Sequence, residues 1–107
     1  METLYISSRA RGTINAALIK IIKINDFSAT PKYVQVADAI VEAIKHKVVE
    51  VGDALPSIND LSYQLQIARD TVEKAYRKLR KEEIIKSSPG KGYFVAREQT
   101  FHLRIAV

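Results

Sequence analysis

Between residues 31 and 96 the spacing of apolar positions predicts three helices followed by a β-hairpin. The first helix is expected from Pro31 to about Lys47, with an apolar stripe on one side and charged residues on the other. Thr30 before Pro31 predicts how it begins, with a capping hydroxyl and then proline at the first helical position. The stripe consists of Val36, Ala37, Ile40, Val41 and Ile44.

A second helix is predicted to begin at Ser57, which follows Leu55-Pro56. Asp60 lies three residues after Ser57, so the two residues resemble a capping box in which Asp replaces the usual Glu. The apolar residues Ile58, Leu61 and Leu65 would form the inner face of this helix. The segment 66–68 then predicts a tight turn into another helix.

The third helix has the clearest pattern in the chain. Val72, Ala75, Tyr76 and Leu79 fall at positions i, i+3, i+4 and i+7, which is typical of an amphipathic helix. Short strands are then expected at 84–87 and 93–96, joined by the glycine-containing turn 88–92. This order predicts a mainly α fold with a small β-hairpin, a winged helix-turn-helix made of three helices and a wing.

The two ends of the chain are less defined, and we divide the chain into a lead segment 1–26, a winged helix-turn-helix domain 27–97 and a stub 98–107. Residues 13–24 show both alternating and helical apolar spacing, so periodicity does not decide their structure. The apolar segments Ile14–Ile24 and Phe101–Val107 are expected either to fold back on the domain or to contact a second subunit. The apolar sequence of the stub suggests the start of a further dimerisation or effector region.

Charge and composition narrow the class of function. The chain of 107 residues has 17 basic and 12 acidic residues, a formal net charge of +5, which favours nucleic acid as a partner before an anionic membrane. It contains no cysteine, which excludes disulfides, thiolate metal sites and cysteine nucleophiles. The histidines, His46 and His102, are far apart in the sequence, so we expect no metal site, no cofactor and no catalytic residues. No apolar stretch is long enough to span a membrane, and we expect a cytoplasmic protein.

The outer face of the third helix predicts a DNA contact. Residues 69–81 include six basic and two acidic side chains. A helix fits the major groove of B-DNA, and residues at its amino-terminal end reach the base edges. Arg69 is therefore the expected base reader, since its guanidinium can donate to both O6 and N7 of guanine. A solvated basic face on an ordinary helix is the alternative.

The hairpin tip favours the DNA-binding interpretation. Gly90 and Gly92 flank Lys91, so the backbone can approach a ligand closely where a positive charge is available. A phosphate-binding P-loop does not fit, because the motif spacing is absent and no helix follows the lysine.

From Pro31 to Ala96, about 66 of the 107 residues, the chain resembles the DNA-binding domain of GntR-type transcription regulators. The resemblance rests on P-K-Y-V-Q-V-A-D-A-I, V-G-D-A-L-P-S-I-N-D-L, A-R-D-T-V-E-K-A-Y-R-K-L and P-G-K-G-Y-F-V. The K-A-Y variant is similar to the YtrA-like branch. The resemblance implies that Arg69 and Thr71 read DNA, that Gly90 and Gly92 approach the minor groove, and that Ser57 caps the second helix near a phosphate. The residues expected to contact DNA are Ser57, Asn59, Arg69, Asp70, Thr71, Lys74, Arg77, Gly90, Lys91 and Gly92.

The chain departs from the family pattern at four positions. Asn59 and Glu73 stand where many relatives have arginine, which predicts a different operator sequence. Ala68 replaces the serine that usually caps the third helix, a loss of about 1 kcal/mol. Gln66 replaces the turn glycine, so it must adopt a left-handed conformation or reshape the turn.

These features predict a sequence-specific DNA-binding transcription regulator, by family habit a repressor. We expect a homodimer on a double-stranded operator with inverted-repeat symmetry; the pattern names no effector ligand. One alternative is a winged-helix protein-interaction or RNA-binding module, which would need no base-reading arginine at the start of the third helix. Another is an enzyme, but no catalytic constellation is present.

Overall fold

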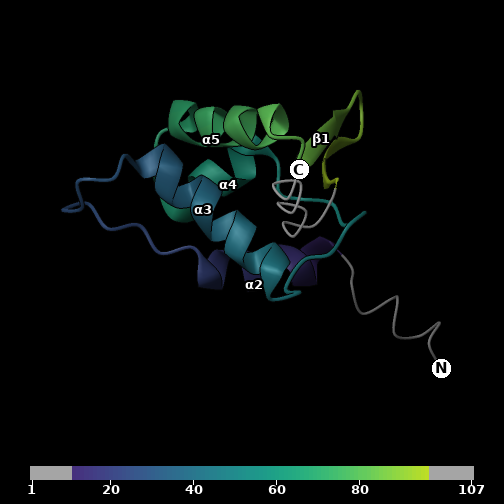
Figure 1. Ribbon diagram of the computed structural model, residues 1–107, viewed down its shortest axis with the longest axis horizontal. Helices are drawn as coiled ribbons and strands as arrows, with labels where there is room; N and C mark the ends of the chain where they lie inside the picture. The colour runs from purple at the N-terminus through teal and green to yellow at the C-terminus, as the bar shows by residue number, and fades with distance from the viewer. Residues whose placement is uncertain (1–10, 97–107) are drawn as a thin grey trace, which may run out of the picture.

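Helix α3 (Lys32–Lys45) packs against α5 (Arg69–Lys81) and α2 (Arg11–Ile21), and α4 (Ile58–Leu65) packs against the same two helices (Figure 1). The computed structural model describes residues 11–96, with side chains described from residue 16. It contains α2 (Arg11–Ile21), α3, α4 (Ile58–Leu65), α5 (Arg69–Lys81) and the strands β1 (Ile85–Ser88) and β2 (Gly92–Val95). The predicted order of three helices and a hairpin is confirmed, with α2 as an additional helix before them.

The start of α3 differs from the prediction. The N-cap residue is Pro31, not Thr30, and it has no side chain that could cap the helix. Gln35, in the first turn, instead forms hydrogen bonds with the segment before the helix. Its Nε2 donates to the carbonyl oxygens of Thr30, at 2.8 Å, and Asn25, at 3.1 Å. The N–H of Asn25 donates in turn to Oε1 of Gln35, at 2.8 Å. A side chain inside the first turn therefore ties the preceding segment to the helix, and the predicted hydroxyl cap is absent.

Helix α2 packs on the domain. It contacts α3 and α4, and Leu18 and the following Ile22 are buried in the same core as the apolar stripe of α3. The alternative in which this apolar segment folds back on its own chain is thus borne out for these side chains. The expectations for 1–10 and for 98–107, including Phe101–Val107, lie outside the described residues.

The α4–α5 turn has the geometry that its unusual residues require. The hydroxyl of Ser57 accepts a hydrogen bond from the N–H of Asp60 at 3.0 Å, as predicted for the start of α4. Gln66 ends α4 in the left-handed conformation, with φ 56°. Ala68 has the extended backbone of an N-cap but provides no side-chain hydrogen bond to α5. The turn keeps its shape although two positions lack the side chains that favour it.

Strands β1 and β2 form an antiparallel hairpin in which Ile85 pairs with Val95 and Ser88 with Gly92. The segment before α4 runs along the other side of β2, where Ala54 forms an isolated bridge with Phe94. The N–H of Leu55 also donates to the Tyr93 carbonyl at 2.8 Å. Ile85 and Val95 are buried in the common core, so the hairpin is fixed to the helices at its base.

None of the described helices combines the length and apolar character needed to cross a bilayer.

Candidate functional site

Helix α5 separates its residues cleanly between the core and the surface. Val72, Ala75, Tyr76 and Leu79 are buried, as the predicted helical phase requires. The surface-facing positions carry the six basic side chains, and the helix lies along one edge of the molecule with the hairpin beside its carboxyl-terminal end (Figure 1). The core thus holds a positively charged ridge in a fixed orientation.

Arg69 opens this ridge, and a residue of α4 holds it in place. Its Nε donates a hydrogen bond to Oδ1 of Asn59, and both side chains are exposed. The sequence singled out both positions but gave no sign that they touch, because ten residues and a turn separate them. Within the described part of the chain, Arg69 forms no ion pair, so its charge remains available to an anionic ligand.

Three of the other basic residues on α5 form ion pairs with acidic residues one turn away. Lys74 lies 4.0 Å from Asp70, Arg77 lies 3.2 Å from Glu73, and Lys78 lies 2.6 Å from Glu82. The Glu82 hydrogen bond raises the pKa of Lys78 above its usual value, so this ammonium group stays charged. Exposed pairs of this kind contribute roughly 0–1 kcal/mol each, so a phosphate can displace the carboxylate at little cost.

Arg80 and Lys81, in the last turn of α5, have no ion-pair partner within residues 16–96. Both are exposed and, with Arg77, line a shallow hollow on the surface of α5. They are not among the residues predicted from the sequence to contact DNA. The spacing of charges could have singled them out, because Lys74, Arg77 and Lys78 each have an acidic residue four positions away and these two residues have none.

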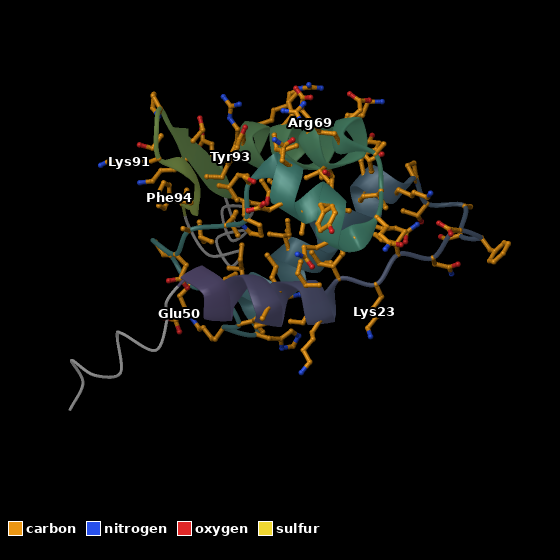
Figure 2. The ribbon with its side chains drawn as sticks, turned by 180° about the vertical axis from the view of Figure 1, so that it is seen from behind. Lys23, Glu50, Arg69, Lys91, Tyr93 and Phe94 are labelled. Atoms are coloured by element: carbon orange, nitrogen blue, oxygen red, sulfur yellow. The ribbon has the colours of Figure 1, made fainter. Side chains whose placement is uncertain are left out.

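The hairpin tip forms the second part of the site. Gly90 and Gly92 have positive φ angles of 77° and 112°, a conformation that glycine adopts without strain. A Cβ at either position would meet no described atom within 4 Å, so the surface of the loop is open. Lys91 between them is exposed and projects from the tip (Figure 2). The tip can therefore bring backbone N–H groups and one positive charge close to a ligand.

Two tyrosines fix the hairpin relative to α5. The rings of Tyr76, on α5, and Tyr93, on β2, meet edge to face with centroids 4.8 Å apart. The Tyr76 hydroxyl donates to the Pro56 carbonyl at 2.7 Å. Burial raises the pKa of Tyr76 above its usual range, so the hydroxyl stays protonated and remains a donor. The ridge and the tip are consequently held at a fixed separation.

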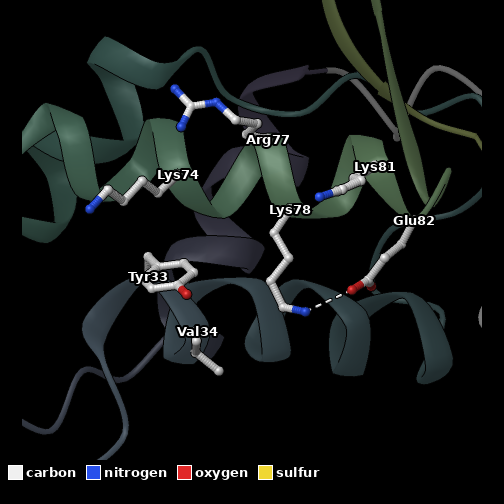
Figure 3. Close-up of a pocket in the computed structure, with 7 residues that line it drawn as sticks. All are labelled: Tyr33, Val34, Lys74, Arg77, Lys78, Lys81 and Glu82. Carbon is white, nitrogen blue, oxygen red and sulfur yellow. Dashed lines mark hydrogen bonds and ion pairs between the residues drawn. The ribbon is translucent and has the colours of Figure 1, made fainter.

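A groove between α3 and α5 extends the positive surface (Figure 3). Tyr33, on α3, lines the groove, and Nζ of Lys74 lies 5.9 Å from the centre of the tyrosine ring. The groove is lined by Tyr33, Val34, Lys74, Arg77, Lys78, Lys81 and Glu82. Four of these residues are basic and one is acidic, so the groove favours anions.

The structure distributes the predicted site residues over three places. Asn59, Arg69, Asp70, Lys74 and Arg77 lie on the exposed face of α4 and α5, and Thr71 is half-buried beside them. Gly90, Lys91 and Gly92 form the hairpin tip. Ser57 is exposed at the start of α4, where its hydroxyl serves the helix cap. Figure 2 shows Arg69 and Lys91 on one side of the molecule and Lys23 and Glu50 on the other.

Comparison with known proteins gives matches over this same region. The profile described as "Bacterial regulatory proteins, gntR family" matches residues 32–95. The HTH-type transcriptional repressor YtrA of Bacillus subtilis is 33% identical over 75 residues, which are 70% of this chain and 58% of that protein. The chain therefore spans somewhat more than half the length of this curated relative.

Solved structures agree with the sequence matches. YtrA from Sulfolobus acidocaldarius, described as a GntR-family transcription factor, superposes with a TM-score of 0.70 at 40% identity, covering 80% of this chain and 92% of that one. The DNA-binding domain of AraR, solved in complex with its operator ORE1, superposes with a TM-score of 0.61 at 30% identity, covering 69% of this chain and 90% of that one.

Proposed function

The chain belongs to the gntR family of bacterial regulatory proteins and contains a winged helix-turn-helix domain, and from this we propose that it binds an operator in double-stranded DNA and regulates transcription, most simply by repression. The observation that carries the proposal is the fixed pairing of the basic ridge of α5 with the glycine-flanked Lys91 at the wing tip. A cytoplasmic site of action follows from the same proposal, because operators lie on chromosomal DNA.

The contacts divide by position along α5. The amino-terminal residues Arg69, Asp70 and Thr71 enter the major groove and face base edges, because this end of a recognition helix reaches deepest. Lys74 and Arg77 leave their carboxylate partners for phosphates, and Lys81 in the groove of Figure 3 also contacts a phosphate. Such phosphate contacts fix the register of the helix on the duplex and carry no sequence information themselves.

The wing tip supplies contacts outside the major groove. Gly90 and Gly92 let the backbone approach the adjacent minor groove, and Lys91 neutralises a phosphate there. A Cβ at either glycine would have no described protein atom within 4 Å, but it would keep the backbone from approaching the nucleic acid closely.

We further propose that two copies bind an inverted repeat. One winged helix contacts few base pairs, and joining two such contacts raises affinity through effective concentration. Two-fold symmetry in the protein then requires two-fold symmetry in the operator, with half-site centres about one helical turn apart. The AraR structures with operators show related domains bound to DNA, which supports the choice of duplex DNA as the ligand.

Selection of bound sequences from a randomised duplex library tests this function. We expect the wild-type protein to enrich a short motif, present twice in inverted orientation. Recovery without any enriched motif would contradict sequence-specific binding. Enrichment of a single, unrepeated motif would contradict the paired arrangement. Tighter binding to a randomised RNA pool than to duplex DNA would favour an RNA-binding module instead.

A further inference from the structure

We propose that Asn59 is a positioning residue for base recognition: it holds the guanidinium of Arg69 in the orientation that reads DNA and does not itself read a base. This inference rests on the proposed DNA-binding function. It assigns Asn59 a different role from the direct contact that its place in the sequence suggested. The contact between Arg69 Nε and Asn59 Oδ1 is the observation that carries it.

The hydrogen bond fixes one edge of the arginine and leaves the other free. A guanidinium has five N–H donors in one plane, and only the Nε donor faces Asn59. The two terminal nitrogens therefore keep all their N–H groups for a ligand. These nitrogens form the fork that matches O6 and N7 of guanine. Asn59 thus sets the plane of the fork without using the donors that would read the base.

The same hydrogen bond argues against direct base reading by Asn59. An asparagine recognises adenine through both its oxygen and its nitrogen, which together match N6 and N7. Here Oδ1 already accepts from Arg69, so an adenine would have to share this oxygen with the guanidinium or displace it. The buried Leu61 and Val72 pack α4 against α5 and keep the two side chains within reach of each other.

Preorganisation explains what the contact adds to binding. A free arginine side chain samples many rotamers, and immobilising it on binding opposes association. An arginine already held by Asn59 loses less freedom when it meets the base. Since Asn59 carries no charge, its effect belongs to the affinity for the correct sequence and not to the salt dependence.

A double-mutant cycle on the full chain tests the assignment, with the duplex that wild-type protein selects from a randomised library as the probe. We expect Asn59→Ala to weaken binding about threefold to tenfold and to relax preference at the base pair that Arg69→Ala also relaxes. In an Arg69→Ala background, Asn59→Ala should have no further effect. The slope of affinity against salt concentration should be the same for Asn59→Ala as for wild type.

Gln64→Ala is the matched control, because Gln64 is exposed on the same helix, and it should change neither affinity nor preference. Melting curves of both single variants should match the wild type, which excludes a folding defect.

Two results would overturn the assignment. An equal loss from Asn59→Ala with and without Arg69 would show that Asn59 touches DNA independently. Unchanged affinity and base preference in Asn59→Ala would show that the contact has no role in recognition. If wild-type protein selects no duplex at all, the proposed function fails first and the inference with it, so the two failures can be told apart.

Discussion

Helices α3, α4 and α5 are each followed, within two residues, by a non-glycine residue in the left-handed backbone conformation. Lys47, Gln66 and Glu83 have φ angles of 62°, 56° and 59°, in the left-handed region. After α4, the N–H of Ile67 donates to the Ser62 carbonyl and that of Gln66 to the Tyr63 carbonyl, the hydrogen bonds of a Schellman motif. The motif satisfies the last carbonyl groups of the helix, but a side chain in this conformation costs roughly 1–2 kcal/mol. Each of these positions is therefore a site where glycine would relieve strain.

Gln66→Gly should raise the free energy of unfolding by about 0.5–1 kcal/mol. The relief of left-handed strain exceeds the extra freedom that glycine gives the unfolded chain. Urea denaturation measures the change. The control is Gln64→Gly, the same substitution two residues earlier inside α4, which should lower stability by about 1 kcal/mol. A loss of stability in both variants would show that Gln66 is not strained.

Tyr76→Phe should lower stability by about 1–2 kcal/mol, because it leaves the Pro56 carbonyl without its donor. The effect depends on pH. Burial raises the pKa of Tyr76 in the folded state, so its contribution is complete below the unfolded pKa of about 10 and declines as pH rises above it.

The difference in stability between wild type and Tyr76→Phe should thus narrow above about pH 10. Thermal melts at a series of pH values test this. Tyr63→Phe is the control, because Tyr63 is 80% exposed and should show no effect. A difference that widens with alkaline pH would mean that the buried tyrosine is ionised in the folded protein.

At the scale of elements, α5 was predictable from sequence and α2 was not. The phase of α5 follows from a strict apolar repeat, and Leu79 is buried as that repeat requires. Residues 13–24 have apolar side chains at both helical and alternating spacing, so only packing against α3 and α4 settles the helix. The hydrogen bond between Asn59 and Arg69 was equally hidden, because it depends on how two helices cross. Local patterns predict elements, whereas contacts between elements need the fold.

Leu18→Ala should lower stability by about 2–5 kcal/mol, as expected when a buried leucine leaves a cavity. The reason is that α2 forms part of the domain core and is not an appendage. Lys20→Ala, on the exposed side of the same helix, should leave the melting temperature nearly unchanged. Equal melting temperatures for Leu18→Ala and wild type would show that α2 does not contribute to the stability of the domain.

Lys91→Ala should weaken binding to all duplexes by a similar factor and reduce the salt slope by about one unit, because one phosphate contact is lost. Titrations at several salt concentrations measure both quantities. Lys23→Ala, on the opposite side of the molecule in Figure 2, should change neither. Reduced sequence preference with an unchanged slope would show that the wing reads bases.

At the scale of the whole molecule, the fold places Arg69 and Lys91, two residues of the proposed DNA contact, on one side (Figure 2). The formal net charge of +5 would attract any polyanion, whereas the proposed duplex contact uses, among the described residues, the ridge of α5 and the wing tip. Because Leu18 and Ile22 belong to their own core, these side chains do not supply contacts to a second copy. In the proposed complex, general charge would therefore account for attraction to DNA, and the fixed geometry would account for sequence preference.

The ratio of affinities for the selected duplex and for a shuffled duplex of the same composition tests this account most directly. At physiological salt we predict a ratio on the order of 10³ or more for the wild-type protein. Arg69→Ala should reduce that ratio roughly fivefold to 150-fold, which corresponds to about 1–3 kcal/mol for one base contact. Equal affinity of the wild-type protein for the two duplexes would contradict the account and reduce the basic ridge to a nonspecific polyanion-binding surface.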